Sequence, residues 1–287
     1  MTTFNKVFYN HAKYASQRPS YNPQLAEYLT KYHLSIPGNV CDVVVDAATG
    51  SGIFARLISK HFKSVFATDV SAKMLSVATQ SEDGGAPIQY IESGAESMPM
   101  ISDSSVDMIT VATGAHWFNP EKFLQEARRI LKPNGTIAIF GISYGYFPDY
   151  PQCDKLIFEL GFEKLGKYWD PGTHILDGLY SKYNTLMREQ GFKDVYMGYH
   201  PHQAKLHVGP NGNLLDEPYV INTKLTWGSL LNYISTWSSI ANYHLDHPNE
   251  RNIAEVYVEK IMSAAGETDM DAPVRYDWGQ SLVICRK

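Results

Sequence analysis

Hydrophobic positions in the first half of the chain switch repeatedly between short continuous runs and a helical spacing. The run Val43-Val44-Val45 is β-branched throughout, which suits a strand buried on both faces. From residue 53 the apolar positions recur at helical spacing. Further apolar runs predict strands at residues 65–68, 88–91, 106–112 and 136–140. Strands that alternate with helices in this way predict a parallel, doubly wound α/β sheet.

The second half of the chain follows a different pattern. It predicts a helix at residues 175–190, a sixth strand at 193–199, helical stretches at 227–243 and 252–265, and a last strand at 274–285. Residues 144–172 are rich in proline, glycine and aromatic residues and are expected to be irregular. The predicted fold class is α/β, a Rossmann-like seven-stranded doubly wound sheet with a helical cap inserted between the last two strands.

Helix start signals support this order of elements. Asn22 precedes Pro23, Ser71 follows the second strand, and Asn119 precedes Pro120, and such residues cap helix N-termini. We expect one domain. Its core lies at about residues 34–143, 173–200 and 273–287, with an N-terminal lid at 1–33 and cap segments at 144–172 and 201–272.

Composition narrows the function classes. Of 287 residues, 19% are charged and 44% hydrophobic, as in an ordinary folded protein, and the net charge of −5 offers no electrostatic footprint for nucleic acid or an anionic membrane. Three widely separated cysteines support neither a disulfide framework nor a zinc finger. No run of about 18 apolar residues predicts a membrane span, and residues 1–16 do not resemble a signal peptide. A cytoplasmic location is therefore expected.

The candidate chemistry begins where the first strand ends. Asp46 opens the stretch Asp46-Ala47-Ala48-Thr49-Gly50-Ser51-Gly52, in which small residues let the backbone turn sharply beside a ligand. Asp69 closes the second strand, where a carboxylate can accept both hydroxyls of a ribose. The two acids together predict a site for an adenosine-containing cofactor.

Two kinds of cofactor fit this turn. Residues 50–55 match the dinucleotide pattern G-x-G-x-x-G/A, so a nicotinamide oxidoreductase is one alternative. Asp46 would repel a diphosphate held at the turn but would accept a cofactor with a cationic amino group and no phosphate, as in S-adenosylmethionine. Ala48 occupies the place of the usual first glycine, a mild departure if the backbone there is not left-handed.

The pattern D-x-A-x-G-x-G resembles the class I methyltransferase signature. The segments at residues 106–118 and 130–136 are similar to the regions after the fourth strand and before the fifth strand in that class. The chain is more specifically similar to the fungal trans-aconitate methyltransferase family, on the segments Arg18-Pro19-Ser20-Tyr21, Ala115-His116-Trp117-Phe118, Phe147-Pro148-Asp149-Tyr150-Pro151 and Thr236-Trp237-Ser238. This resemblance implies S-adenosylmethionine as cofactor and a small carboxylic acid as acceptor, which becomes a methyl ester. A catalytically silent, cofactor-binding or partner-binding relative is a further alternative.

The expected site residues follow from the predicted strand ends and from this resemblance. His116 and Trp117 are the catalytic candidates, because their N–H groups could hold an anionic oxygen beside the fourth strand. The cofactor-binding candidates are Tyr14, Arg18, Asp46, Ala48, Gly50, Gly52, Asp69, Val70, Ala95, Glu96, Val111 and Ala112. The aromatic N-terminal arm that carries Tyr14 and Arg18 is interpreted either as plain hydrophobic docking or as a lid. No metal site is expected, since the clustered histidines lack a completing ligand set.

Overall fold

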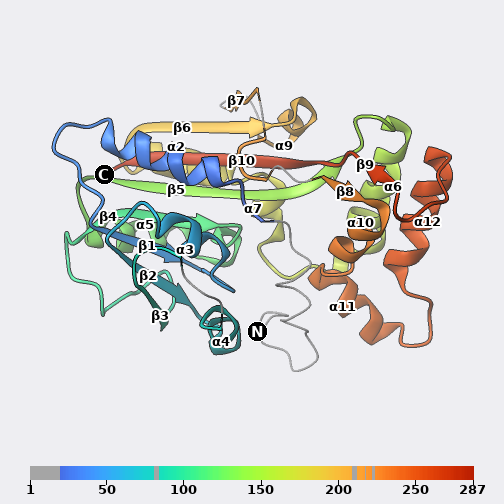
Figure 1. Ribbon diagram of the computed structural model, residues 1–287, viewed down its shortest axis with the longest axis horizontal. Helices are drawn as coiled ribbons and strands as arrows, with labels where there is room; N and C mark the ends of the chain where they lie inside the picture. The colour runs from blue at the N-terminus through green and yellow to red at the C-terminus, as the bar shows by residue number, and fades with distance from the viewer. Residues whose placement is uncertain (1–19, 81–83, 209–211, 217, 222–223) are drawn as a thin grey trace.

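The central element of the computed structural model is an eight-stranded sheet in the order β3-β2-β1-β4-β5-β10-β6-β7 (Figure 1). The structure describes residues 20–80, 84–208, 212–216, 218–221 and 224–287. The strands are β1 Val43–Ala47, β2 Ser64–Asp69, β3 Ile88–Glu92, β4 Val106–Ala112, β5 Leu131–Tyr146, β6 Lys193–His200, β7 Asn213–Leu214 and β10 Asp277–Arg286. Strands β1 to β5 are parallel, and β10 runs antiparallel to both β5 and β6.

The strand order reverses between β1 and β4, which are neighbours although two strands separate them in the chain. In open α/β sheets a crevice forms at such a switch point, beyond the carboxyl ends of the strands. The predicted doubly wound Rossmann-like architecture is confirmed, and it fixes where a ligand site is to be sought.

Helices cover both faces of this sheet. They are α2 Pro23–Leu34, α3 Ile53–Ile58, α4 Ala72–Ala78, α5 Pro120–Ile130 and α8 Ser181–Glu189. The side chains of β1 alternate between two cores: Val44 lies in the cluster that contains Phe54 of α3, and Val45 lies in the cluster that contains Phe123 of α5. The predicted caps are confirmed, because the side chains of Asn22, Ser71 and Asn119 each accept a hydrogen bond from a first-turn N–H group.

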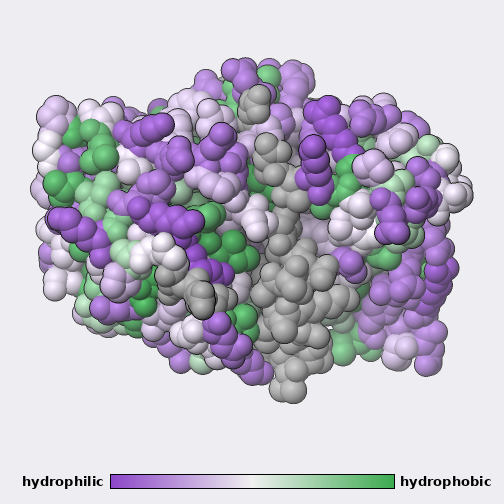
Figure 2. Space-filling model, viewed as in Figure 1, coloured by the Kyte–Doolittle hydropathy of each residue, from purple (hydrophilic) through white to green (hydrophobic). Residues whose placement is uncertain are grey.

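A second group of helices lies past one end of β5 and β10, at the right of Figure 1. It comprises α6 Asp154–Phe158, α10 Trp227–Ile234, α11 Ser238–Asp246 and α12 Ile253–Ala265. Tyr257 and Ile261 of α12 are buried, whereas Glu259 and Lys260 are exposed. Figure 2 accordingly shows hydrophilic residues over much of the outer surface at this end. No helix within the described residues is long and apolar enough to cross a membrane.

The sequence-based prediction differs from the structure in the second half. The sheet has eight strands rather than seven, because the two-residue strand β7 pairs with β6. Strand β5 continues to Tyr146, where an irregular segment was expected, because β10 pairs with it along that length. Residues 151–168 are mostly helical, including α6 and the π-helix Glu159–Lys164.

The helix expected at residues 175–190 is two helices, α7 Thr173–Asp177 and α8. Leu179 and Tyr180 interrupt it with positive φ angles of 49° and 62°. The Leu179 carbonyl accepts a hydrogen bond of 2.6 Å from the Ser281 hydroxyl on β10. Because this interruption turns the chain, α7 does not continue along the axis of α8. It packs instead against the carboxyl end of β5.

Candidate functional site

A cavity of about 220 Å³ lies at the carboxyl ends of β1, β2 and β4. We call it the first cavity. It is lined by Tyr21, Ala48, Thr49, Gly50, Ser51, Ile53, Phe54, Asp69, Val70, Ser71, Met74, Ser93, Ala95, Glu96, Ala112, Thr113, Gly114, Trp117 and Phe118. Seven of the twelve expected cofactor-binding residues are therefore brought together here: Ala48, Gly50, Asp69, Val70, Ala95, Glu96 and Ala112.

Asp69 connects two loops of the first cavity. Its Oδ2 accepts a hydrogen bond of 2.9 Å from the Gly50 N–H group, and its Oδ1 accepts one of 2.8 Å from the Ser71 N–H group. Burial raises the pKa of this carboxyl, against the lowering effect of these N–H donors. Each carboxylate oxygen retains a further lone pair, so Asp69 can also accept hydroxyl donors from a ligand.

Asp46 does not border the first cavity, which corrects the expectation that it faces a cationic amino group. It is fully buried, its Oδ2 accepts a hydrogen bond of 2.6 Å from the Thr49 hydroxyl, and its Oδ1 accepts one of 2.7 Å from the Thr110 hydroxyl. Burial raises the pKa of Asp46 to about 6, although both hydroxyls lower it. Asp46 therefore ties the glycine turn to β4 from within the core.

Ala48 has a left-handed backbone with a φ of 54°. The condition under which the alanine was expected to be harmless therefore fails, because a left-handed conformation costs an alanine about 1–2 kcal/mol relative to a right-handed one. Gly50 and Gly52 have φ angles of 57° and 75°, which glycine adopts without this cost. The turn is thus left-handed at three of five consecutive residues and still places Ala48 on the cavity wall.

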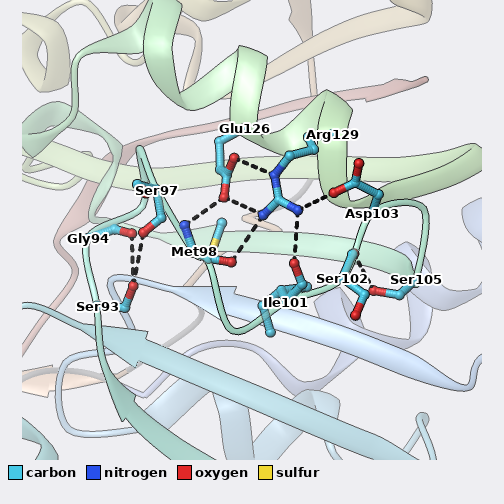
Figure 3. A network of polar contacts seen from close by, with 10 residues as sticks. All are labelled: Ser93, Gly94, Ser97, Met98, Ile101, Ser102, Asp103, Ser105, Glu126 and Arg129. Carbon is cyan, nitrogen blue, oxygen red and sulfur yellow. Dashed lines mark hydrogen bonds and ion pairs between the residues drawn. The ribbon is translucent and has the colours of Figure 1, made fainter.

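The loop after β3 presents Ala95 and Glu96 to the first cavity. Figure 3 shows how Arg129 of α5 holds this loop: its guanidinium donates to the carbonyl oxygens of Met98 and Ile101 at 3.0 and 2.9 Å and pairs with Glu126 and Asp103. The Glu126 carboxylate in turn accepts a hydrogen bond of 2.6 Å from the Met98 N–H group. A charge-assisted network therefore fixes one wall of the cavity from behind.

The remaining expected cofactor contacts are not at the wall. The Val111 side chain is buried in the core, and the position of a Gly52 side chain would face Arg56 and Tyr90 rather than the cavity. Tyr14 and Arg18 lie outside the described residues. Within the expected lid, helix α2 packs on the core through Leu25 and Leu29, and Tyr21 alone lines the first cavity among residues 20–33.

A second, smaller cavity of about 90 Å³ adjoins the first. It is lined by Thr113, His116, Trp117, Ile142, Ser143, Tyr144, Trp169, Thr173, Leu176, Asp177, Tyr233, Trp237 and Ser238. Thr113 and Trp117 border both cavities. The His116 Nδ1 atom lies 3.1 Å from the Tyr180 hydroxyl, and its ring packs on Trp117 with centroids 4.5 Å apart. The two expected catalytic residues are thus side by side at this junction.

The large aromatic side chains of this region divide between the second cavity and the core. Tyr144, Trp169 and Trp237 line the second cavity, whereas Trp278 is buried in the core against Tyr233 with centroids 5.5 Å apart. No group of three or more His, Cys, Asp or Glu side chains within the described residues could hold a metal ion.

Sequence reasoning missed Tyr21 and Thr113. The Tyr21 hydroxyl donates a hydrogen bond of 3.1 Å to the Thr113 hydroxyl, between the two cavities. Thr113 has a φ of 52°, which is rare for a β-branched residue and is typical of strained functional positions. The signal for Thr113 was its place between the end of the fourth predicted strand and Gly114; Tyr21 ends the segment Arg18-Pro19-Ser20-Tyr21 on which the family resemblance rested.

Comparison with known proteins agrees with this geometry. The family described as "Methyltransferase domain" matches residues 45–139, which contain the glycine turn, Asp69 and the His116-Trp117 pair. The chain is 25% identical over 297 residues to a Saccharomyces cerevisiae protein named as an S-adenosylmethionine-dependent methyltransferase, CRG1, covering 100% of this chain and 98% of that protein. It is 32% identical over 187 residues to a methyltransferase-named protein of Dictyostelium discoideum, covering 62% of this chain and 65% of that protein.

The chain is an S-adenosylmethionine-dependent methyltransferase, as the matched domain and the methyltransferase-named relatives indicate. Its fold is similar to that of a solved structure from Anaeromyxobacter dehalogenans named as a type II methyltransferase, with a TM-score of 0.66, 20% identity, and coverage of 94% of this chain and 97% of that one. A Haemonchus contortus phosphoethanolamine N-methyltransferase, solved in complex with S-adenosyl-L-methionine, shares the fold with a TM-score of 0.52 and 14% identity, over 96% of this chain and 56% of that one.

S-adenosylmethionine is the cofactor of this methyltransferase, so the nicotinamide alternative is wrong. The first cavity suits such a molecule by its chemistry. It joins the half-buried carboxylate of Asp69, which can accept hydroxyl donors, to apolar side chains from Ile53, Met74 and Phe118 that can cover a flat ring. Three left-handed residues at the turn bring bare backbone close to this space.

Proposed function

We propose that this methyltransferase transfers the methyl group of S-adenosylmethionine to a small molecule bound in the second cavity. The observation that carries the proposal is the shared wall: Thr113 and Trp117 border both cavities, so a donor in one and an acceptor in the other would meet at these residues. Methyl transfer needs the acceptor atom, the methyl carbon and the sulfur in line, in a site from which water is excluded.

The chain's own residues would act by binding and alignment. Asp69, the glycine turn and the Ala95-Glu96 loop would hold the cofactor, while His116 and Trp117 would form the floor on which the acceptor is oriented. The bound cofactor supplies an electrophilic methyl group on a positively charged sulfur. Trp117 would close the space between the two ligands, because its side chain is common to both cavities.

The helices beyond the sheet would serve as a cap on the acceptor side. Tyr233 of α10, Trp237 at the start of α11 and Trp169 from the segment after β5 contribute to the second cavity. The cap and the Rossmann-like core would then form one methyltransferase domain, because the cavity needs side chains from both.

The name of one relative supports the carboxylic acid that the family resemblance implies. A Marinomonas protein named malonyl-[acyl-carrier protein] O-methyltransferase is 30% identical over 158 residues, covering 54% of this chain and 57% of that protein. No lysine or arginine within the described residues lines the second cavity, however, so its described wall offers no cation to hold an acid. The geometry therefore supports a small-molecule acceptor and does not favour an anionic one.

Calorimetric titration with S-adenosylmethionine, S-adenosylhomocysteine and NAD tests the proposal. We expect binding of the adenosyl pair only, weakened at least tenfold by Asp69→Asn, because hydrogen bonds to a charged acceptor contribute about 1.5–3 kcal/mol. Asp42→Asn is the matched control, since Asp42 lies at the amino end of β1, opposite the cavity, and pairs with Lys63. Equal binding by Asp69→Asn, or no transfer of labelled methyl to any of a broad set of small acceptors, would overturn the proposal.

A further inference from the structure

The second cavity contains one carboxylate that nothing in the described chain neutralises. The Oδ1 atom of Asp177, the last residue of α7, is buried and has no hydrogen-bond partner among the residues that the structure describes. An unpaired buried acceptor costs about 1–3 kcal/mol or more, so such a group usually has a partner that binds it. Burial raises the pKa of Asp177 to about 6.

The walls around Asp177 are aromatic. The Tyr144 ring lies edge-on to Trp169 and to Trp237, with centroids 6.0 and 5.6 Å apart, and the rings of Trp169 and Trp237 are 5.6 Å apart. Ring faces arranged in this way attract flat apolar molecules and cations. Together with the single carboxylate, they make the described wall unfavourable for a polycarboxylate and favourable for a neutral or positively charged ring-bearing molecule.

Besides the phenols of Tyr144 and Tyr233, the wall carries one more titratable group, His116, and its role differs from that of Asp177. Its Nδ1 atom lies 3.1 Å from the Tyr180 hydroxyl, and the ring is 8% exposed between Trp117 and Tyr180. His116 is therefore held by its neighbours as a positioning residue, whereas Asp177 has an oxygen left to accept a proton.

We propose that Asp177 is the general base of the reaction and that the acceptor is a flat apolar molecule whose attacking atom carries a proton, as in a hydroxyl or an amine. In the reaction the acceptor oxygen or nitrogen forms a bond to the methyl carbon as the carbon–sulfur bond breaks. The electron pair of that bond stays on sulfur, which becomes a neutral thioether. The proton of the attacking atom passes to the Asp177 carboxylate and then to solvent. This inference rests on the proposed function and adds the acceptor class and the base.

Ligand binding tests the inference without a known substrate. With the protein saturated in S-adenosylhomocysteine, phenol, benzylamine and benzoate are titrated by the fluorescence of the tryptophans that line the cavity. We expect wild-type protein to bind phenol and benzylamine at least tenfold more tightly than benzoate. Asp177→Asn should weaken benzylamine at least tenfold and strengthen benzoate, because it removes one negative charge at nearly constant shape. Asp246→Asn on the exposed end of α11 is the control and should change none of these affinities.

Benzoate binding as tight as that of phenol, unaltered affinities in Asp177→Asn, or no binding of any of the three probes would overturn the inference. The calorimetric titration of S-adenosylmethionine separates this failure from that of the proposed function, because Asp177 does not line the first cavity. If the cofactor binds but Asp177→Asn is silent, the inference alone is wrong.

Turnover gives the second test. Labelled-methyl transfer to sets of phenols, aromatic amines and carboxylic acids should favour the first two, and Asp177→Asn should lower kcat at least 100-fold with little change in KM. In the wild-type protein the rate should rise as the pH increases through about 6, because Asp177 then loses its proton. The Asp177→Asn variant should not show this rise. Other titratable groups near Asp177 are His174 on α7, Tyr144 and Tyr146 on β5, His116, and His207 on α9 Lys205–Val208. His207→Gln should keep the rise. Carboxylic acids methylated at equal rates by wild type and Asp177→Asn would overturn the inference.

Discussion

The methyl group of Ala48 fills the space that Gly114 leaves open. A side-chain carbon added at Gly114 would lie 2.6 Å from the Ala48 Cβ atom and 3.4 Å from its carbonyl oxygen. The first turn after β1 and the turn after β4 thus accommodate each other at the wall of the first cavity. An alanine in the place of the usual glycine is tolerated because its neighbour across the switch point has no side chain.

This relationship predicts a coupled pair of substitutions. Gly114→Ala should lower the free energy of unfolding by about 1–3 kcal/mol through overpacking. Ala48→Gly should raise it by up to about 1 kcal/mol, because glycine adopts a φ of 54° without strain. In the double variant the cost of Gly114→Ala should shrink by at least about 1 kcal/mol in urea unfolding. Strict additivity of the two changes would show that the residues do not share this space.

The buried Asp46 predicts a pH dependence of stability. Its pKa is about 6 in the folded protein and 3.8 in the unfolded chain, so between these values the unfolded chain binds fewer protons. Stability contributed by this group therefore falls as pH rises from about 4 to 6, by up to about 3 kcal/mol. Urea unfolding at pH 4.5 and 7 should show Asp46→Asn gaining on wild type at the higher pH. A constant difference between the two proteins would contradict the prediction, and Asp42→Asn, exposed beside Lys63, serves as the control.

The position of His116 predicts that its substitution affects turnover but not cofactor binding. It borders the second cavity but not the first, so His116→Ala should lower turnover at least tenfold and change the Kd for S-adenosylmethionine less than twofold. Kinetic assays and calorimetry on one preparation measure both quantities. His174→Ala, on the exposed side of α7, should leave turnover unchanged. Normal turnover in purified His116→Ala would exclude a role for this residue.

Arg129 predicts a link between a distant charge network and the cofactor site. Arg129→Met would remove the donors that hold the Met98 and Ile101 carbonyl groups and leave Glu126 without its ion pair (Figure 3). We expect the free energy of unfolding to fall by about 1–3 kcal/mol, since Arg129 is partly exposed, and the Kd for S-adenosylmethionine to rise several-fold. Arg251→Met removes exposed ion pairs on α12 and should change neither value beyond about 0.5 kcal/mol. If Arg129→Met bound S-adenosylmethionine as tightly as wild type, the ion-pair network around Arg129 would have no influence on the cofactor site.

Much of the part of the chain that lines the first cavity can be predicted from the sequence, because the residues that specify each strand and helix cap lie within or next to that element. The run at residues 106–112 is mostly apolar, with Asp107 and Thr110 as its polar members, and β4 has those bounds. The three helix caps depend on side chains next to their own helices. The placement of Asp69 at the wall follows from its position at the end of β2, where parallel strands direct their carboxyl ends to one edge.

The rest depends on partners far away in the chain. The conformation of Ala48 is acceptable only because residue 114 is glycine, and neither turn contains that information by itself. The segment after β5 is held by partners far along the chain: Phe147 stacks on Trp227 of α10, and Glu159 accepts a hydrogen bond from the Tyr257 hydroxyl of α12. Asp177 lies within a helical pattern, and its unpaired position arises only where α7 meets β5.

The antiparallel strand β10 lies between β5 and β6, although it is the last of the three to be synthesised. During translation, β1 to β5 can pair with one another as soon as they leave the ribosome, whereas β6 and its partner β7 join the rest of the sheet only when β10 arrives. Until then the edge of β5 exposes unpaired backbone groups that could pair with another chain. The pairing of β10 with β5 and β6 would therefore be the slow, concentration-sensitive stage of folding. A stalled or shortened nascent chain would carry β1 to β5, including the strands that border the first cavity, with the edge of β5 open.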